Sequence, residues 1–390
     1  MTLHPPKPAE RPIWLTADSG DFEVFRQIVS QTAKPADTPL ATEILRNIPF
    51  YDGMKVDAAA ADPVRRQALM EEWADVFAQG AGIIVIRQGL ADHGVIDRAT
   101  EIFDQIIDDE KAAAKGGGDH FAKPGANDRI WNALEKHCLA DPANFAAYFS
   151  SNGIALASEA WLGPAYQMTA QVNRVNPGGA AQTPHRDYHL GFMTAARMAQ
   201  FPAHIHAVSP TLTLQGAVAH CDMPVETGPT MVMPFSQQFF EGYLAFSRPE
   251  FQAHFAANHV QLSLAKGDLM FFNPAVMHGA GTNHTTDRFR MANLLQVSSA
   301  FGRAMETVNR TQMVRALYPA MKDAAGMNVA NVVAASAEGY PFPTNLDSNP
   351  PIGGIAPRSQ ADYFHAALAQ RQSDEAFFAV LARLERKNRS

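Results

Sequence analysis

Hydrophobic and polar positions repeat along the chain with two different periods, and the change comes near Tyr166. In the run from Pro63 to Gly80, apolar residues recur every three to four positions, as on one face of a helix. Asp62 and Pro63 supply a helix start, and Gly80 supplies a stop. The pattern therefore predicts a helix over this run.

Three more elements are predicted before the period changes. Residues 82–90 (GIIVIRQGL) form a short apolar run, which is typical of a buried strand. Residues 93–114 have helical spacing and end before the three glycines at 116–118, and residues 143–161 have helical spacing as well. The first part of the chain is therefore predicted to be helical, with at least one strand of the core.

Beyond residue 166, short β-type runs alternate with Gly, Pro, Asn and Asp. This spacing is typical of an antiparallel sandwich or jelly roll. A helical insertion over 236–257 interrupts the runs. The runs cover residues 166–179, 211–224, 228–234, 260–268, 269–278 and 290–299.

The two ends of the chain differ from its middle. The first 20 residues are rich in Pro and polar groups and are predicted to be a flexible arm. After Phe301 the pattern is helical, crosses a Pro-rich loop at 340–357 and ends in a charged amphipathic helix over 360–388. We expect one integrated domain with four regions. They are the arm (1–20), a helical region with the first strands (21–165), the β core (166–302) and a helical extension (303–390).

Composition narrows the possible classes of protein. The 390 residues are 46% apolar, which is enough for a sizeable core. The net charge of -7 comes from 39 acidic and 32 basic residues spread along the chain, without the basic cluster that nucleic-acid binding needs. With only Cys138 and Cys221, a disulfide framework is not expected. The chain shows neither a signal sequence nor an apolar run of about 18 residues, so we expect a soluble, cytoplasmic protein without a membrane partner.

The stretch TPHRDYHLGF (183–192) places His185 and Asp187 two positions apart, where Thr, Pro and Gly indicate a strand that runs into a turn. With 14 histidines in the chain, roughly one His-x-Asp motif is expected by chance. A second copy does occur, at His220 and Asp222. The motif alone therefore does not identify a metal site.

A third ligand is available further along the chain. A non-haem iron site that activates O2 needs two neutral imidazoles and one carboxylate on one face of the ion. The segment KGDLMFFNPAVMHGAG supplies His278 at the end of a strongly apolar strand, where glycines open the backbone. Arg290 begins the next strand, and its guanidinium suits a dicarboxylate. His278 could complete an iron site beside Arg290 with either His-x-Asp pair, and the residues alone do not decide between His185 with Asp187 and His220 with Asp222.

The order and spacing of these motifs resemble the phytanoyl-CoA dioxygenase family of Fe(II)- and 2-oxoglutarate-dependent oxygenases. The resemblance rests on His185-Arg186-Asp187, on GPTMVMPFSQQ at 228–238 and on the segment from Gly267 to Arg290. The strand at 82–90 and the helix after it are similar to the family's opening as well. The match covers roughly residues 80 to 300, and the combination is more specific than any single motif.

The resemblance implies a mostly β core with flanking helices, folded as a double-stranded β-helix (jelly roll, cupin-like) with the metal at its open end. It also implies Fe(II) bound by His185, Asp187 and His278. The co-substrates would be 2-oxoglutarate and O2, and the co-products succinate and CO2. His220 and Asp222 would fall at a strand end and in a turn. Related halogenases replace the carboxylate ligand with a small residue so that chloride can bind, so Asp187 favours hydroxylation or a related oxidation.

The chain departs from the family pattern in two places. The family often has a hydroxyl residue two positions after the distal histidine, where this chain has Ala280. The loop to the arginine is one residue longer, so Arg288 competes with Arg290 for the carboxylate of 2-oxoglutarate. We favour Arg290, because it begins the apolar run while Arg288 lies in the turn. Gln171 and Asn173 project from the strand before the ligands, and they either contact the co-substrate or are paired polar groups on a sheet face.

Other candidate residues have simpler interpretations. His189 lies too far along an extended segment to reach the same ion, which favours a role in packing or in the substrate pocket. His204 and His206 would share a strand face, but no third ligand accompanies them, so we interpret them as structural or exposed. The stretch 120–137 indicates either part of a lid over an anionic or aromatic substrate or an ordinary junction between helix and loop.

We therefore expect a 2-oxoglutarate-dependent oxygenase that oxidises a small organic molecule. One alternative is a cupin-like metal enzyme that does not use 2-oxoglutarate, in which Arg290 would be a structural ion-pair partner. Another is a catalytically silent jelly roll that binds a small ligand or a protein, and the intact ligand set argues against it. No basic cluster suits the phosphates of an acyl-CoA. The final helix indicates internal packing or a contact in a homo-oligomer.

Overall fold

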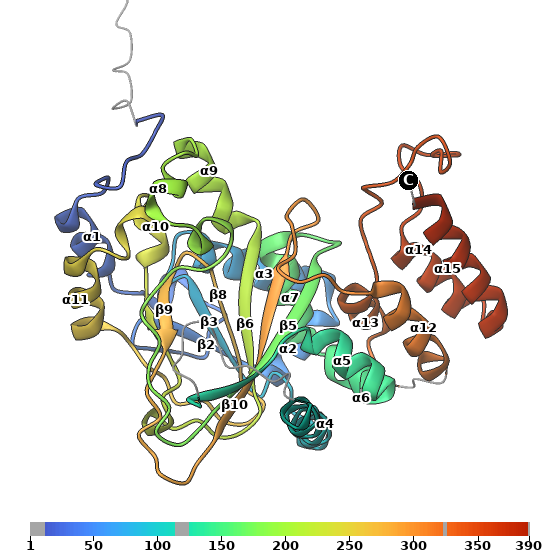
Figure 1. Cartoon of the computed structure of the whole chain (residues 1–390), viewed down its shortest axis with the longest axis horizontal. Coiled ribbons are helices and arrows are strands. Elements are labelled where there is room, and N and C mark those ends of the chain that lie inside the picture. The colour runs from blue at the N-terminus through green and yellow to red at the C-terminus, as the bar shows by residue number, and fades with distance from the viewer. Residues whose placement is uncertain (1–11, 114–124, 323–325, 389–390) are drawn as a thin grey trace, which may run out of the picture.

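The computed structural model describes residues 12–113, 125–322 and 326–388. Residues 1–11 of the predicted arm, the glycines at 116–118 and the first part of the 120–137 stretch lie outside the described residues. Within the described chain, the strands form two sheets, and helices surround them (Figure 1).

An eight-stranded sheet forms the centre of the molecule. Its strands are β1 (Glu43–Leu45), β2 (Ile48–Asp52), β3 (Ile83–Arg87), β4 (Asn127–Ile130), β5 (Gln167–Val175), β6 (Thr213–Ala219), β8 (Leu269–Phe272) and β10 (Arg290–Ser298). Across the sheet the order is β1-β2-β3-β8-β6-β10-β5-β4, and all neighbours are antiparallel except the parallel pair β2 and β3. A smaller antiparallel sheet pairs β7 (Thr230–Met233) with β9 (Met277–Ala280).

The larger sheet has one apolar face and one partly polar face. Successive side chains of a strand point to opposite sides, so β5 directs Met168 and Val172 into the apolar core and Gln171 and Asn173 to the other side. The central strand β10 repeats this alternation and places Gln296 on the polar side. The polar side faces a cavity that the smaller sheet also lines.

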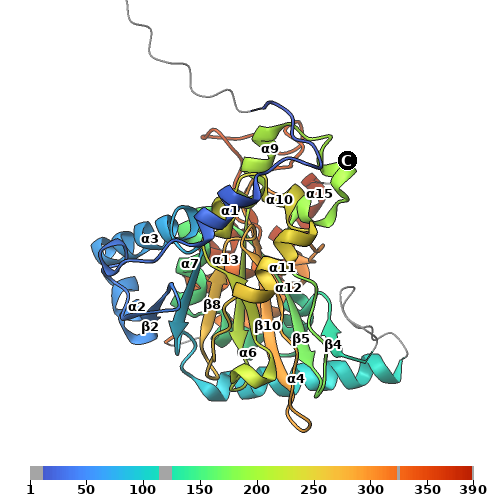
Figure 2. The same ribbon diagram turned by 90° about the vertical axis from the view of Figure 1, so that its left-hand side faces the viewer.

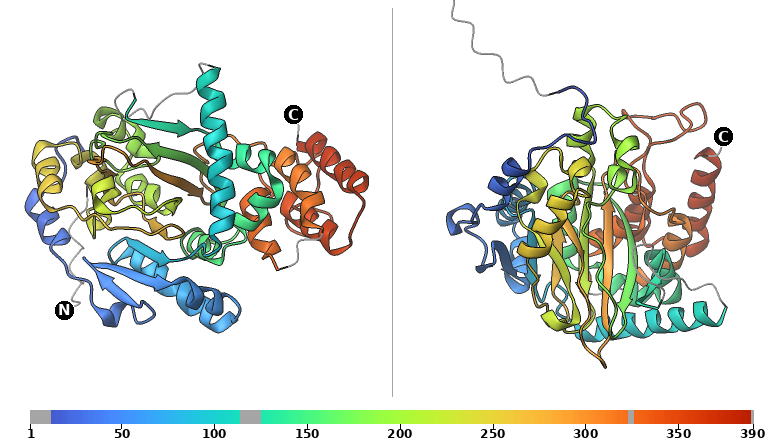
Figure 3. Two further views of the ribbon diagram at one scale, coloured as in Figure 1. Left: turned by 90° about the horizontal axis from the view of Figure 1, so that it is seen from below. Right: turned by 60° about the vertical axis from the view of Figure 1, so that its left-hand side comes forward.

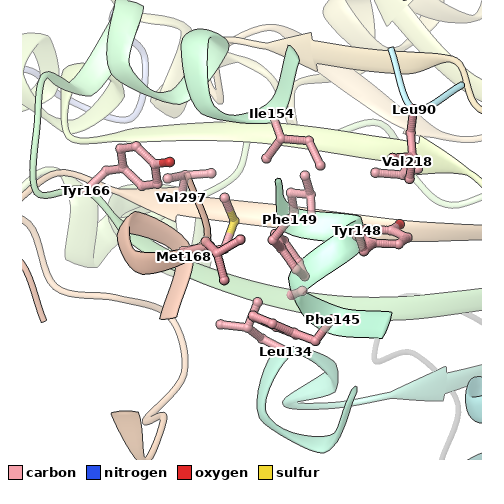
Figure 4. Packing of buried hydrophobic residues seen from close by; sticks show 14 of the residues in the cluster. Leu90, Leu134, Phe145, Tyr148, Phe149, Ile154, Tyr166, Met168, Val218 and Val297 are labelled. Carbon is pink, nitrogen blue, oxygen red and sulfur yellow. The ribbon is translucent and has the colours of Figure 1, made fainter. Parts of the chain in front are cut away.

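Helices cover the apolar face. They are α2 (Gly53–Ala60), α3 (Pro63–Ala78), α4 (His93–Ala112), α5 (Ala133–Ala140), α6 (Pro142–Phe149) and α7 (Asn152–Leu162). Figure 2 shows α4 running beside one end of the strands. In Figure 4, Phe149 and Ile154 pack in one cluster with Met168 and Val297 of the sheet. Each such buried side chain contributes roughly 2 kcal/mol through the loss of apolar surface to water.

The predicted helix from Pro63 and the predicted strand over 82–90 are confirmed as α3 and β3, whereas the predicted single helix over 143–161 is wrong. The structure has two helices there, α6 and α7. Between them, the hydroxyl of Ser151 accepts a hydrogen bond from the N–H of Ile154 and caps α7. Ser150, Ser151, Asn152 and Gly153 interrupt the apolar pattern at the break, and the prediction of one helix passed over this signal.

The run at 260–268, predicted to be a strand, forms only two isolated bridges, from Val260 to Val232 and from Leu264 to Met223. The stretch 183–192 likewise has a single bridge at His185, followed by the short 3-10 helix η2 (His189–Phe192). The predicted strand at His204 and His206 is wrong as well. These two residues lie on helix α9 (Ala203–Val208), which begins directly after Pro202.

The predicted helical insertion over 236–257 contains α10 (Gly242–Ala245) and α11 (Pro249–Asn258). Near them lie α1 (Phe22–Val29) and α8 (Ala195–Met198). Phe25 of α1 contacts Phe251 of α11, with ring centroids 4.9 Å apart. The segment before α1 also packs, because Leu15 is buried and the carbonyl of Ile13 accepts a hydrogen bond from Ala203. The packed part of the chain therefore begins before residue 21.

The C-terminal extension forms four helices at one end of the molecule (Figures 1 and 3). They are α12 (Arg310–Met321), α13 (Val329–Ser336), α14 (Gln360–Ala369) and α15 (Asp374–Asn388). The predicted single helix over 360–388 is wrong, because the chain breaks at Arg371, whose φ is 47°. Phe377 and Leu381 of α15 are buried inside the extension. Among the described residues, no helix combines the length and apolar character that crossing a membrane requires.

Candidate metal centre and its cavity

The three predicted metal ligands lie together between the two sheets. His185 and His278 of β9 form an isolated antiparallel bridge, with N–H to carbonyl distances of 2.8 and 3.0 Å. The Nε2 atom of each histidine lies 3.4 Å from a carboxylate oxygen of Asp187. Within the described residues, His185, Asp187 and His278 make up a cluster of side chains that could hold a metal ion. One possible ligand atom from each residue lies within 4.8 Å of those of the other two.

The two imidazole rings are oriented by their other nitrogen. Nδ1 of His185 lies 2.7 Å from the carbonyl of Thr183, and Nδ1 of His278 lies 2.8 Å from the carbonyl of Val276. A carbonyl only accepts hydrogen bonds, so in the neutral rings the proton sits on Nδ1. Both Nε2 atoms then direct a lone pair toward the Asp187 carboxylate. Two nitrogen lone pairs and an anionic oxygen on one side of a point are a donor set that fits a divalent metal ion.

The environment of Asp187 favours its ionised form. The side chain is buried, which alone would raise its pKa, but when His185 and His278 are protonated at Nε2 their hydrogen bonds and charges lower the pKa well below its usual range. The backbone of Asp187 is also fixed, because its N–H donates to the carbonyl of Pro274 and its carbonyl accepts from the hydroxyl of Tyr243. These two backbone hydrogen bonds therefore fix the position from which the Asp187 side chain extends toward the histidines.

Gln215 of β6 is a neighbour of Asp187 that the sequence analysis missed. Its Nε2 donates a hydrogen bond to the Asp187 carboxylate, and its side chain is buried on the cavity side of the sheet. The available signal was a single glutamine in an otherwise apolar strand. Sequence spacing could not connect it to Asp187, because the contact depends on how β6 lies against the loop after residue 183.

Arg186, between the two first ligands, points away from the metal cavity. Its guanidinium is buried and donates to the carbonyls of Ser236 and Phe239, and it lies 5.6 Å from the centre of the Tyr243 ring. Burial lowers the pKa of Arg186 to about 10, so it stays charged at neutral pH. It ties the ligand-bearing loop to the helical insertion.

A cavity of about 460 Å³ opens beside the triad, and we call it the metal cavity. Gln171, Asn173 and Arg290 line it from the larger sheet, and Thr230 and Ala280 line it from the smaller one. This volume lies in the usual range for small-molecule sites.

The two candidate arginines have opposite environments. Arg290 is 3% exposed and lines the metal cavity, whereas Arg288 is exposed and pairs with Glu226 at 2.9 Å. Nε of Arg290 donates to the carbonyl of Thr227 at 3.1 Å. Its Nη2 is buried without a hydrogen-bond partner among the described residues. Burial lowers the pKa of Arg290 to about 10, so its charge persists at neutral pH.

Gln171 and Asn173 both face the metal cavity, and both also contact protein groups. Asn173 accepts a hydrogen bond from Asn127 of β4 at 2.9 Å. Nε2 of Gln171 lies 3.3 Å from the sulfur of Met305 and 3.5 Å from Oε1 of Gln296. The structure thus shows protein contacts for both side chains, and their contact with the co-substrate stays a prediction.

The rival pair does not form a metal site with other described residues. Nδ1 of His220 lies 2.8 Å from the hydroxyl of Thr100, and Nε2 lies 2.9 Å from the hydroxyl of Tyr148. Asp222 accepts a hydrogen bond from the N–H of Lys266 in a turn. His220 therefore connects the helices to the sheet.

The described part of the 120–137 stretch contributes to the metal cavity. Arg129 and Trp131 line it, with the guanidinium 5.2 Å from the centre of the indole ring. Phe192 of η2 lines it as well, whereas His189 is not among the lining residues. Burial lowers the pKa of His189. Met305 and Glu306, from the loop after β10, were not singled out in the sequence and also line the cavity.

No curated protein matches the sequence of the chain. Among solved structures, the non-heme alpha ketoglutarate dependent epimerase SnoN from nogalamycin biosynthesis is 20% identical, with a TM-score of 0.41, and the likeness covers 60% of this chain and 84% of SnoN. AviO1 from Streptomyces viridochromogenes is 17% identical, with a TM-score of 0.44, and the likeness covers 61% of this chain and 97% of AviO1.

The sequence signature of the family described as Phytanoyl-CoA dioxygenase (PhyH) matches residues 64–292, which is more than half of the 390 residues. The matched range begins in α3 and ends in β10, so it contains all three candidate ligands and Arg290. The chain therefore belongs to the phytanoyl-CoA dioxygenase family, whose members are non-haem iron enzymes that depend on 2-oxoglutarate.

Proposed function

We propose that the protein is an Fe(II)- and 2-oxoglutarate-dependent dioxygenase that hydroxylates or otherwise oxidises a small organic molecule, with release of succinate and CO2. The observation that carries the proposal is the donor set of His185, Asp187 and His278, with both Nε2 atoms turned toward the carboxylate. It lies beside a cavity that also holds the buried guanidinium of Arg290. Family membership supports the same cofactor and co-substrate.

In this proposal His185, Asp187 and His278 would hold the iron, and 2-oxoglutarate and O2 would enter the cavity beside it. Bound iron supplies the redox chemistry that couples decarboxylation of 2-oxoglutarate to oxidation of the substrate. The chain fixes the ligands through the Nδ1 contacts of the histidines and through Gln215 at the carboxylate. The apolar and amide groups around the triad keep bulk water away from it.

We assign the distal carboxylate of 2-oxoglutarate to Arg290. Its buried Nη2 without a partner among the described residues needs an acceptor, and a carboxylate supplies one together with a compensating charge. Gln171 and Asn173 are proposed to contact the co-substrate through their remaining polar atoms. Where the family often has a hydroxyl group, this chain has Ala280. Its cross-strand neighbour Thr230 lines the same cavity and is proposed to replace that contact.

We also propose that the larger and smaller sheets are the two halves of a double-stranded β-helix. The support is that both sheets line the metal cavity, and that isolated bridges at His185, Val232 and Met223 extend the smaller one. This arrangement puts the ligands between the two sheets, with His278 on β9 of the smaller one.

The test is iron binding and co-substrate turnover in matched variants. The purified protein should bind one Fe(II) per chain and should form succinate from 2-oxoglutarate when substrates are screened. His278→Ala removes a ligand, so iron binding at micromolar metal should be lost. Asp222→Asn alters a turn outside the cavity and should bind iron as the wild type does. Equal loss in both variants, or iron binding that survives in His278→Ala, would show that the ligand set is wrong.

A further inference from the structure

Glu306 lies where the metal cavity meets a second cavity. It belongs to the loop after β10 and lines the metal cavity next to Met305. It also lines a cavity of about 540 Å³ between this loop and the C-terminal helices, which we call the C-terminal cavity. Glu306 is thus shared by the linings of the two cavities.

The carboxylate of Glu306 has one engaged and one unengaged oxygen. Oε1 accepts a hydrogen bond of 2.6 Å from the backbone N–H of Asn132. Asn132 has φ 52° and ψ 41°, a left-handed conformation that turns this N–H toward the carboxylate. Oε2 is buried and accepts no hydrogen bond from the residues that the structure describes. A buried acceptor without a donor is costly, and such atoms in native proteins call for a missing partner.

The electrostatics around Glu306 indicate which partner would suit it. Burial raises the pKa of Glu306, although the Asn132 N–H, the charges of Arg129 and Lys136 and the Gln171 amide each lower it. A donor with a positive charge at Oε2 would offset the cost of burying the ionised carboxylate. Arg129 itself lies against the Trp131 ring.

Under the proposed function, on which this inference rests, Asp187 and Arg290 have partners, and the charge of Arg129, which also lines the cavity, acts on Glu306. Iron neutralises Asp187, and 2-oxoglutarate neutralises Arg290. The carboxylate of Glu306 is then the acidic group left for the substrate, and Trp131, Phe192 and Met305 give the same cavity aromatic and sulfur surface. Aromatic faces stabilise ammonium groups and tolerate the apolar carbons attached to them.

We propose that the substrate carries a cationic nitrogen, and that this group donates a hydrogen bond to Oε2 of Glu306 while the carbon to be oxidised faces the metal. A site built around such a contact rejects analogues that lack the donor, because the carboxylate would remain buried and unpaired. The substrate class is thus amines or other protonated nitrogen bases of small size.

The test uses n-butylammonium as the probe and 1-butanol as its neutral counterpart, with the protein loaded with Fe(II) and 2-oxoglutarate without O2. Ligand-observed NMR titrations give the two dissociation constants. Wild-type protein should bind butylammonium at least about tenfold more tightly than butanol, the size expected for a hydrogen bond to a charged group. Glu306→Gln keeps an oxygen for the Asn132 N–H and should lose this preference.

Glu385→Gln is the matched control. Glu385 lines the C-terminal cavity and not the metal cavity, and its change to Gln alters the net charge of the protein by the same amount as Glu306→Gln does. Equal affinity for the two probes in the wild type would overturn the proposal without any variant. So would a preference that persists in Glu306→Gln, or one that Glu385→Gln removes equally. Binding of Fe(II) and 2-oxoglutarate is measured in the same samples. Its failure would contradict the proposed function, whereas intact loading with no ammonium preference contradicts only this inference.

Discussion

Arg288 and Arg290 are two positions apart, but only Arg290 lies inside β10, where strand alternation turns its side chain into the metal cavity. Arg288 precedes the strand and is held at the surface by Glu226. A bidentate, charge-assisted pair with a carboxylate in a buried site is worth about 3 kcal/mol. Arg290→Met should therefore weaken 2-oxoglutarate binding about a hundredfold and leave iron binding intact.

Arg288→Met is the matched control, since it removes the same charge from an exposed position. Calorimetric titration of the iron-loaded variants with 2-oxoglutarate measures both effects. If Arg288→Met shows the large loss and Arg290→Met does not, the co-substrate carboxylate binds elsewhere and the assignment of Arg290 is wrong.

Gln215 should affect the metal without touching it. Its hydrogen bond orients the Asp187 carboxylate, and partners of this kind alter metal affinity by about tenfold to a hundredfold. Gln215→Leu should weaken Fe(II) binding by about tenfold, measured by competition with a chelator. The apo variant should keep its melting temperature to within a few degrees, because leucine fills the space of the glutamine. Unchanged iron affinity would show that the backbone alone positions Asp187.

Candidate site residues could be found from the sequence where they belong to a short motif. His185 and Asp187 are two positions apart and His278 ends an apolar strand before a glycine, which made them candidates, but it took the resemblance to the family to favour them over His220 and Asp222. Gln215 and Glu306 could not be predicted in this way. Gln215 reaches Asp187 only because of strand pairing, and Glu306 reaches the cavity through a contact with the backbone of Asn132, 174 positions away in sequence.

At the scale of elements, predictions succeeded where the ends of the element are marked in the sequence. The helix α3 begins at Pro63 after the capping residue Asp62, and the observed cap is the one predicted. The break between α6 and α7 is marked by Ser150, Ser151 and Gly153, a signal that the prediction of one helix passed over. The strand predicted over 260–268 has the right residues but forms only two isolated bridges. Tertiary packing decides such cases.

His220 connects three elements, since it lies at the end of β6 and contacts Thr100 of α4 and Tyr148 of α6. Burial, together with the charges of His137 and Lys266, lowers its pKa from 6.5 to about 3. Between these two values the unfolded chain binds a proton that the folded protein does not. The stability that depends on neutral His220 is therefore complete above about pH 6.5 and is lost as the pH falls toward 3.

His220→Gln should separate this effect from other titrations. The amide does not titrate, so the variant should be less stable than the wild type at pH 7.5, because it fits the two hydroxyl contacts less well. The difference should shrink by about 2 kcal/mol between pH 7.5 and 5.0, since one group contributes about 1.4 kcal/mol per pH unit below its unfolded pKa. Urea unfolding at both pH values measures the difference. A constant difference would mean that His220 titrates normally in the folded protein.

At the scale of the whole molecule, one apolar cluster runs from the N-terminal region through the sheet into the C-terminal extension. It includes Trp73 of α3, Leu295 of β10 and Phe377 of α15. A polar contact joins the same parts, because the partly buried guanidinium of Arg310 in α12 donates to the carbonyl of Met168 in β5. The residues of α15 that suggested an oligomer contact are thus used within the chain, and oligomerisation through this helix stays a prediction.

This continuity predicts that the four regions unfold as one unit. Independent domains have separate cores, whereas here removing α12–α15 would expose the apolar surface that Met168 and Val297 share with α12 and α13. Hydrogen exchange followed by mass spectrometry in increasing denaturant should therefore show peptides of α12 and of β5 losing protection at the same concentration. Tryptophan fluorescence should change at that concentration too, because all four tryptophans lie at or before residue 161. Early exchange of α12–α15 while β5 stays protected would show that the extension is a separate domain, and that the sheet is stable without it.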